Sequence, residues 1–447
     1  MSMSISSARD DAAIYQRPAE LLQQLIRFNT TNPPGDEAAC IAYVNKLLTA
    51  AGFHTTILAA DPARPNLIAR LQGRGNAPPL LLQGHVDVVT TEKQAWQQPP
   101  FAGNIVDGYV WGRGTLDMKG GVAMMIAAFM RAGVEGASLP GDVILAVLSD
   151  EEAGGDYGAK YLVENHADLF KGVRYALGEF GGYTAHIAGK RFYPIQVLEK
   201  QVCWMKAIVR GPGGHGSFPM HGGTTAKLAR MLQQLDQHRL PVHITPIPRQ
   251  MLEAMSAVLP DPTASLLRQL LDPVQTDQTL DLLGPLVQMF DPILHNTVNV
   301  TIIRGGNKIN VIPSEIVVEM DGRLLPGYTP DDMVKELRSI IGDDVELELV
   351  RYDVGRAEAD MGLYDTLGTI LCEADPDGIP VPLLMPGVTD GRFFSRLGIQ
   401  TYGFLPMNLP PDFNFLQTIH AADERIPVEA MEFGTHAIYE VLKRNKV

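Results

Sequence analysis

The segment VILAVLSDEEAGG, residues 143–155, joins the pattern of a buried strand to three consecutive carboxylates. Residues 143–148 are apolar and partly β-branched, and glycines follow within a few residues, which predicts a short buried strand. Asp150, Glu151 and Glu152 come next. Because like charges at the end of a buried strand repel one another, we expect cations to lie opposite these acids.

Strands and helices alternate on both sides of this segment. The hydrophobic pattern predicts further strands at residues 66–71, 80–83 and 175–178, and helices at residues 19–28, 37–51, 117–131 and 158–165. This alternation favours an α/β domain whose mostly parallel sheet is covered by helices on both faces.

A different pattern begins near residue 197. Strands are predicted at residues 201–210, 299–304, 316–323 and 345–351, and helices at residues 224–235 and 330–341. The order β-α-β-β-α-β is typical of a ferredoxin-like α+β domain with a small antiparallel sheet. A leucine-rich helical insertion is expected at residues 237–296.

The α/β pattern returns after about residue 353. A chain of 447 residues is too long for one ordinary domain. We therefore expect an α/β domain built from residues 1–198 and 354–447, interrupted by an inserted domain of residues 199–353.

The composition excludes several kinds of partner. Lys and Arg number 37 against 51 Asp and Glu, which argues against nucleic acid or an anionic membrane surface. The N-terminus lacks the features of a signal peptide and no apolar stretch could span a membrane, so a cytoplasmic location is expected. The three cysteines are far apart and form no CxxC pair, so His, Asp and Glu would have to hold any metal ion.

The segment LLLQGHVDVV, residues 80–89, ends a predicted strand with His85 and Asp87. In an extended chain these two side chains lie on the same face. A carboxylate beside a histidine can hold one ring nitrogen and prepare the other to bind a metal ion. The alternative is a strand-end histidine with an unrelated neighbour.

Further candidates lie near strand ends and helix starts. Asp117, in VWGRGTLDMKGG, precedes a helical pattern, where it could bind a metal ion or simply cap the helix. Glu151 and Glu152 point in different directions, so one can coordinate a metal ion while the other accepts a proton from water. A solvated acidic loop is the alternative. Glu179 ends a predicted strand, and His420 lies in TIHAADERIP.

Two histidines and three carboxylates make up the resulting set: His85, Asp117, Glu152, Glu179 and His420. Four of the five fall at strand ends or just before a helix, where a parallel sheet gathers loops from distant sequence. This donor set suits two divalent ions with one bridging carboxylate, and favours zinc, manganese or cobalt. Two such ions would polarise a carbonyl and generate hydroxide, and they would be the cations that the acids at 150–152 require.

With these residues in place, the sequence resembles the dinuclear zinc hydrolases that include aminoacylase, carboxypeptidase G, acetylornithine deacetylase and succinyl-diaminopimelate desuccinylase. The resemblance spans most of the chain and rests on GHVDVV, the glycine-rich block of residues 99–121, SDEEAGG, RGPGGHGS, NKINVIPSE with DGRLLPG, GVTDGRFF and HAADERIP. It implies an amidohydrolase or peptidase that acts on N-acyl amino acids or small peptides with a free carboxylate.

The resemblance also implies a role for each candidate residue. One ion would be held by His85, Asp117 and Glu179, and the other by Asp117, Glu152 and His420. Zinc is expected first, with cobalt or manganese as alternatives. Glu151 would be the general base, Asp87 would orient His85, and the peptide bond between Asp117 and Met118 would be cis.

By the same resemblance, the inserted domain would be a lid that also forms a homodimer. His215, in PGGHGS, would stabilise the oxyanion, often from the partner subunit. Asn310 and Arg323 would form a substrate clamp on the lid. Arg392, in TDGRFF, would bind a substrate carboxylate through its forked guanidinium, or pack against the aromatic pair that follows it.

Two features indicate different substrates. Glutamate at position 179 is commoner among the N-acyl amino acid deacylases of this family, whereas the insertion at residues 237–296 resembles the longer carboxypeptidase-like members. A carboxypeptidase or dipeptidase specificity is therefore one alternative, and a catalytically inactive binding protein is another. A phosphate-binding loop at GPGGHGS is disfavoured because the lysine of a P-loop is missing.

Overall fold

The computed structural model describes residues 13–446, so the first 12 residues, on which the prediction of no signal peptide partly rests, lie outside it. The chain forms two compact units. The first comprises Met1–Val197, Ala359–Val381 and Thr389–Val447, and the second comprises Leu198–Glu358 and Pro382–Val388. Within the described range, no helix has the length and apolar character needed to cross a membrane.

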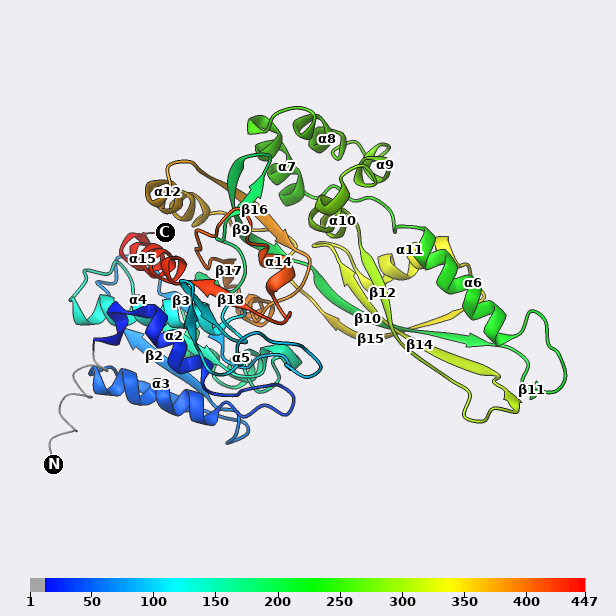
Figure 1. Cartoon of the computed structure of the whole chain (residues 1–447), viewed down its shortest axis with the longest axis horizontal. Helices are drawn as coiled ribbons and strands as arrows, with labels where there is room; N and C mark the ends of the chain where they lie inside the picture. The colour runs from blue at the N-terminus through cyan, green and yellow to red at the C-terminus, as the bar shows by residue number, and fades with distance from the viewer. Residues whose placement is uncertain (1–12, 447) are drawn as a thin grey trace. The chain divides into compact units, whose positions relative to one another are not determined.

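A nine-stranded mixed sheet, most of whose residues belong to the first unit, has the order β1-β2-β6-β3-β7-β17-β9-β16, with β8 paired to β9 (Figure 1). Its strands are β1 (Thr55–Leu58), β2 (Asn66–Leu71), β3 (Leu80–His85), β6 (Val143–Leu148), β7 (Tyr175–Gly178), β8 (Ala185–Ile187), β9 (Lys190–Glu199), β16 (Gly378–Met385) and β17 (Gln400–Gly403).

The prediction of a mostly parallel sheet is right only for the centre of this sheet. Strands β6, β3, β7 and β17 are parallel neighbours, whereas the β1–β2, β2–β6, β17–β9 and β8–β9 pairs are antiparallel. The β8–β9 hairpin turns through Ala188 and Gly189, both with positive φ. A turn of this kind joins antiparallel strands directly, without a crossover helix.

Strand β6 shows why the central strands are apolar throughout. All six of its residues are buried. Ile144, Ala146 and Leu148 pack in one cluster with Leu162 of helix α5 (Ala159–Asn165). The alternate residues of a strand point to the other face of the sheet, so β6 must be apolar on both sides.

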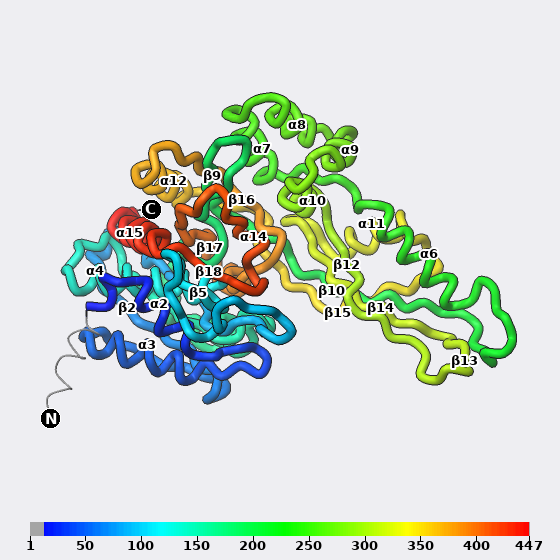
Figure 2. Tube along the Cα trace, in the orientation of Figure 1, coloured from blue at the N-terminus to red at the C-terminus, as the bar shows by residue number. Residues whose placement is uncertain are grey.

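Helices from both ends of the chain pack together in the first unit. Figure 2 shows α15 (Val428–Arg444) beside α4 (Lys119–Val134) and α2 (Pro18–Ile26), and the three helices contact one another. The remaining α-helices of this unit are α3 (Ala38–Ala50), α12 (Tyr364–Ala374), α13 (Gly391–Phe394) and α14 (Phe415–Thr418).

A small sheet brings two distant loops of the first unit together. Its strands are β4 (Ile105–Val106), β5 (Tyr109–Trp111) and β18 (Arg425–Pro427), in the order β18-β5-β4. Arg425 pairs with Trp111. The segment before α4 therefore runs beside the segment that follows His420.

The second unit contains a four-stranded antiparallel sheet in the order β12-β14-β10-β15. Helices α6 and α11 contribute Leu228 and Leu337 to the same core as Met205 and Val318 of the sheet. The predicted β-α-β-β-α-β order is confirmed. The elements are β10 (Gln201–Arg210), α6 (Thr224–Gln237), β12 (Thr297–Gly305), β14 (Glu315–Leu324), α11 (Pro330–Ile341) and β15 (Glu346–Asp353).

Residues 237–296, where a helical insertion was expected, contain four α-helices separated by turns and loops. These helices are α7 (Pro246–Val258), α8 (Thr263–Gln269), α9 (Thr276–Leu280) and α10 (Val287–Leu294). The two short strands β11 (Gly214–His215) and β13 (Val311–Ile312) pair separately from the main sheet of this unit. The unit also extends beyond the predicted segment 199–353, because it includes residues up to Glu358 and Pro382–Val388. Within it, the backbone amide of Lys200 donates to the carbonyl of Met385.

Candidate metal centre

The carboxyl ends of three parallel strands deliver candidate ligands to one edge of the large sheet. His85 is the last residue of β3, Glu152 follows β6, and Glu179 follows β7 directly. Strands β6, β3 and β7 are parallel neighbours, so these ends lie together. Asp117 comes from the loop before α4, and His420 from the loop before β18.

The first group of side chains consists of His85, Asp117 and Glu179. Nε2 of His85 lies 3.1 Å from Oδ1 of Asp117 and 3.3 Å from Oε2 of Glu179. The three donor atoms lie within 4.8 Å of one another. One imidazole and two carboxylates at such distances could hold a divalent ion.

The second group consists of Asp117, Glu152 and His420. Nε2 of His420 lies 3.2 Å from Oδ2 of Asp117 and 3.3 Å from Oε1 of Glu152. These donor atoms also lie within 4.8 Å of one another. Asp117 thus presents a different oxygen to each group, which is the geometry that a bridging carboxylate needs.

Asp117 does not cap the helix that follows it. Helix α4 begins at Lys119, and its N-cap residue is Met118, without a side-chain cap. The helix predicted to start at residue 117 therefore starts two residues later, and the alternative role for Asp117 is not observed. The peptide bond between Asp117 and Met118 is cis, as the resemblance implied.

The donor set fits a cation. Oε1 of Glu152 is buried and accepts no hydrogen bond from the residues that the structure describes, although Nε2 of His420 is 3.3 Å away. A buried carboxylate oxygen without a donor is costly, and a metal ion would satisfy it.

The charges of the group are strongly interdependent. Burial and the Asp117 carboxylate raise the pKa of Glu152 to about 7. The nearby carboxylates of Asp117 and Glu152 raise the pKa of His420 to about 10. Burial alone would raise the pKa of Asp117, but hydrogen bonds from His420 and His85 outweigh it and lower the pKa. Such mutual perturbation is typical of functional sites.

Asp87 contacts both the candidate ligand His85 and the loop that carries Glu151 and Glu152. Nδ1 of His85 donates to the backbone carbonyl of Asp87 at 3.1 Å and lies 3.4 Å from its Oδ1. The carboxylate of Asp87 also accepts the backbone amides of Glu151 and Glu152, each at 3.1 Å. Asp87 therefore leaves Nε2 of His85 available and fixes the backbone that carries the two glutamates.

Asp150 does not share the setting of the two glutamates that follow it. Its Oδ1 lies 2.8 Å from Nη1 of Arg64 and accepts a hydrogen bond from Nδ2 of Asn32 at 3.1 Å. The expectation that all three acids face metal ions is wrong for Asp150, because a buried arginine neutralises it. Arg64 also pairs with the buried Glu37 at 2.7 Å. Nothing in the local sequence around Arg64 indicated this contact.

Glu151 belongs to neither group of candidate ligands. Burial raises its pKa, against the opposing charges of His85 and Arg392. Nη1 of Arg392 lies 3.4 Å from Oε1 of Glu151 and 2.8 Å from the carbonyl of Thr389, and the guanidinium stacks on Phe393 at 4.4 Å. Arg392 is thus buried among protein acceptors, and its role toward a substrate stays a prediction.

The other predicted residues lie in the second unit. His215 is exposed on β11, with Nδ1 2.7 Å from Oγ of Ser217. The carbonyl of Asn310 accepts the amide of Gly216 at 2.9 Å. Arg323 is held by Asp321 through two hydrogen bonds of 2.7 and 3.1 Å. Their roles in oxyanion stabilisation and substrate binding stay predictions.

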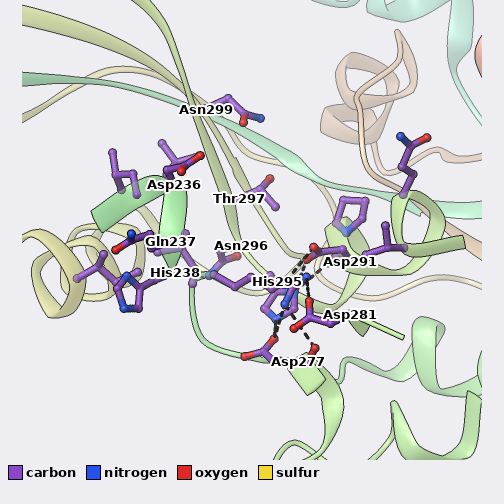
Figure 3. Close-up of a pocket in the computed structure, with 18 residues that line it drawn as sticks. Asp236, Gln237, His238, Asp277, Asp281, Asp291, His295, Asn296, Thr297 and Asn299 are labelled. Atoms are coloured by element: carbon purple, nitrogen blue, oxygen red, sulfur yellow. Dashed lines mark hydrogen bonds and ion pairs between the residues drawn. The ribbon is translucent and has the colours of Figure 1, made fainter. Parts of the chain in front are cut away.

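A pocket of about 900 Å³ lies wholly in the second unit and contains none of the predicted residues (Figure 3). Two of its cationic or basic side chains already pair with three of its aspartates. Arg239 lies 2.8 Å from Asp281 and 2.9 Å from Asp291, and His295 lies 3.1 Å from Asp277. The size of this pocket alone therefore does not make it the reactive centre.

Comparison with protein families identifies the class of protein that this fold and site define. A model described as peptidase family M20/M25/M40 matches residues 81–444. The match covers most of the chain and all of the candidate ligands. The chain belongs to this family, and it is a hydrolase of amide or peptide bonds.

Curated relatives show a range of activities. The chain is 27% identical over 82% of its length to a probable carboxypeptidase S-like protein of Dictyostelium discoideum, of which the match covers 72%. It is 27% identical to the N-fatty-acyl-amino acid synthase/hydrolase PM20D1 of Homo sapiens, over 82% of this chain and 74% of that protein. It is 25% identical to aminoacylase-1 of Sus scrofa, over 91% and 89%.

Solved structures share the fold at low sequence identity. A metallo-carboxypeptidase of the M20 family from Sulfolobus solfataricus superimposes with a TM-score of 0.70 at 16% identity, covering 96% of this chain and 99% of that one. The di-peptidase Dug1p from Saccharomyces cerevisiae gives 0.67 at 16%, covering 100% and 99%.

Proposed function

We propose that this chain uses two divalent metal ions to hydrolyse the amide bond of N-acyl amino acids that carry a free carboxylate. The observation that carries the proposal is the Asp117 carboxylate, whose two oxygens face one ligand group each at 3.1 and 3.2 Å. Zinc is the first choice of ion, with cobalt or manganese as alternatives, because the donors are imidazole and carboxylate alone.

The bound ions would polarise the amide carbonyl and lower the pKa of the attacking water. Glu151 would accept the proton of this water, since its carboxylate interacts with the charges of His85, Asp117 and Glu152 without belonging to either ligand group. Its raised pKa brings it closer to the range in which a base works near neutral pH. As the C–N bond breaks, Glu151 would pass the proton to the leaving amine, so that a carboxylate and an amine are released.

The inserted domain would act as a lid and form a homodimer, and His215 would donate to the oxyanion from this lid. Asn310 and Arg323 would bind the substrate there. The order of strands in the second unit supports its assignment as the ferredoxin-like domain that the resemblance implies. A cytoplasmic location stays a prediction.

Two observations support N-acyl amino acids as the substrate class. The relatives include aminoacylase-1 and an N-fatty-acyl-amino acid hydrolase, and position 179 is glutamate. A carboxypeptidase or dipeptidase is the second candidate, favoured by the carboxypeptidase S-like relative and by the helical insertion at residues 237–296. The inactive alternative is disfavoured, because the sequence keeps all five candidate ligands and Glu151.

A panel of N-acetyl, N-succinyl and long-chain N-acyl amino acids, with matched dipeptides, separates the two candidates. The proposal predicts that the metal-loaded protein releases amine faster from the acyl amino acids. Faster release from the dipeptides would replace it with the peptidase alternative. Amidated forms of each substrate test whether the free carboxylate is required.

A further inference from the structure

Arg113 and Glu424 form a buried ion pair next to the loop that carries Asp117. Their side chains are 1% and 0% exposed, and Nη1 of Arg113 lies 2.6 Å from Oε2 of Glu424. Neither residue belongs to the two groups of candidate ligands. A buried pair of charges is stable only when further hydrogen bonds satisfy it, so its other contacts show what the pair holds.

Glu424 holds the backbone that leads to Asp117. Its Oε1 accepts the amides of Leu116 at 2.7 Å and Asp117 at 3.3 Å, and its Oε2 accepts the amide of Gly114 at 3.2 Å. Gly114 has a φ of +89°, and a Cβ there would lie 2.7 Å from the side chain of Val88. One carboxylate therefore ties down a tight glycine loop that ends at the shared ligand.

Arg113 contacts the loop that carries the candidate ligand His420. Its Nη2 donates to the backbone carbonyl of His420 at 3.1 Å and to Oε1 of Gln94 at 2.7 Å. Nε2 of Gln94 donates to the same carbonyl of His420 at 2.9 Å. His420 has a φ of +60°, which non-glycine residues rarely adopt. Two donors thus hold this residue in an unfavourable backbone conformation.

We propose that the Arg113–Glu424 pair is a positioning device that fixes the Asp117 and His420 loops relative to each other. The inference rests on the proposed function only in that Asp117, Glu152 and His420 hold a metal ion. Both residues act through the backbone of others, so they are positioning residues and not catalytic ones. The pair sets the affinity with which Asp117, Glu152 and His420 bind their metal ion. The first group depends on the pair only through Asp117, because His85 ends β3 and Glu179 directly follows β7.

The substitution Arg113→Lys separates this role from general stability. Lysine keeps a positive charge beside Glu424, but its ammonium cannot contact Glu424, Gln94 and His420 with the planar fork of arginine. We expect the melting temperature to fall only modestly, because the buried pair keeps both of its charges. In titrations of the metal-stripped full chain with Zn²⁺, followed by calorimetry, we expect one of the two ions to bind about 10- to 100-fold more weakly.

Two further variants keep the test decisive. The double variant Arg113→Met/Glu424→Gln removes both charges and should weaken the same ion if Arg113→Lys fails to fold. Leu21→Ala is the control, because Leu21 is fully buried in α2, outside both loops, and its loss should lower the melting temperature but leave both affinities unchanged.

The inference is overturned if folded Arg113→Lys binds both ions with wild-type affinity, or if Leu21→Ala weakens an ion equally. Hydrolysis plays no part in this readout. Selective loss of one ion in a protein that hydrolyses no amide would therefore support the inference and overturn the proposed function. A wild-type chain that binds no Zn²⁺ would overturn both.

Discussion

Nη1 of Arg64 lies 2.8 Å from Oδ1 of Asp150, so the first of the three consecutive acids has a cation of its own. Asn32 donates to Asp150 at 3.1 Å and to Asp87 at 2.8 Å, which links this buried pair to the residue that orients His85. The repulsion among the acids is thus relieved in two ways. A protein cation neutralises Asp150, whereas Glu152 joins a group of candidate metal ligands.

Replacing Arg64 should therefore destabilise the fold even when no metal is present. Arg64→Met would leave Glu37 and Asp150 buried without their cation, and we expect a loss of about 3–5 kcal/mol in the free energy of unfolding. Urea unfolding in the presence of a chelator measures it. Arg70→Met is the control, because Arg70 and Asp142 form a partly exposed pair that should contribute less than about 1 kcal/mol. Equal losses in the two variants would contradict the account.

Glu151→Gln should abolish turnover and preserve metal binding. The amide keeps the size of the side chain but cannot accept the proton of the attacking water, so kcat should fall by about 10²- to 10⁴-fold. Metal content measured on the same sample should match that of the wild type. Glu164→Gln makes the same change on the half-exposed Glu164 and should leave kcat unchanged. A Glu151→Gln protein with a near wild-type rate would remove Glu151 as the base.

The affinity for metal should rise with pH. Near neutral pH a proton competes with the metal ion for His420, whose pKa is about 10. Below about pH 7 a second proton competes with the metal ion for Glu152. Raising the pH removes these protons, so the affinity should rise about tenfold per pH unit for each competing proton. Competition with a chelator of known affinity, from about pH 6 to about pH 8, measures the slope. A flat profile would mean that these groups are not ligands.

Lys200 should make the stability of the protein depend on pH. Burial lowers its pKa from 10.5 to about 7, so between these values the unfolded chain binds a proton that the folded chain does not. The free energy of unfolding should therefore rise as the pH increases from about 7 to 10.5, by up to about 1.4 kcal/mol per pH unit. Lys200→Met should show a correspondingly shallower rise than the wild type. Identical slopes in the two proteins would show that Lys200 remains charged when folded.

Much of the fold could be predicted because hydrophobic periodicity is a local signal. The strands at residues 66–71, 143–148, 175–178 and 201–210 and the helix at residues 330–341 have the predicted bounds. The antiparallel direction of β2 was missed because hydrophobic periodicity does not report strand direction, and edge strand β1 was missed because it lacks such a pattern. Strand β1 has no alternation of buried and exposed residues.

The candidate metal ligands could also be predicted from the sequence. The five candidate ligands stand at strand ends and loop ends, where the sequence makes them visible, and the structure brings them together. Arg64, Asn32, Arg113 and Glu424 were missed because each meets its partner only through tertiary folding. Arg113 and Glu424, for example, are joined by the pairing of β5 with β18.

If the two groups that share Asp117 hydrolyse amides, they should do so only with bound metal ions. Metal content and amine release from an N-acyl amino acid can be measured in one preparation, while Zn²⁺ or Co²⁺ is added back to the chelator-treated protein. We expect no release from the stripped protein and full activity at about two ions per chain. Full activity after chelator treatment, or no hydrolysis with both ions bound, would contradict this expectation.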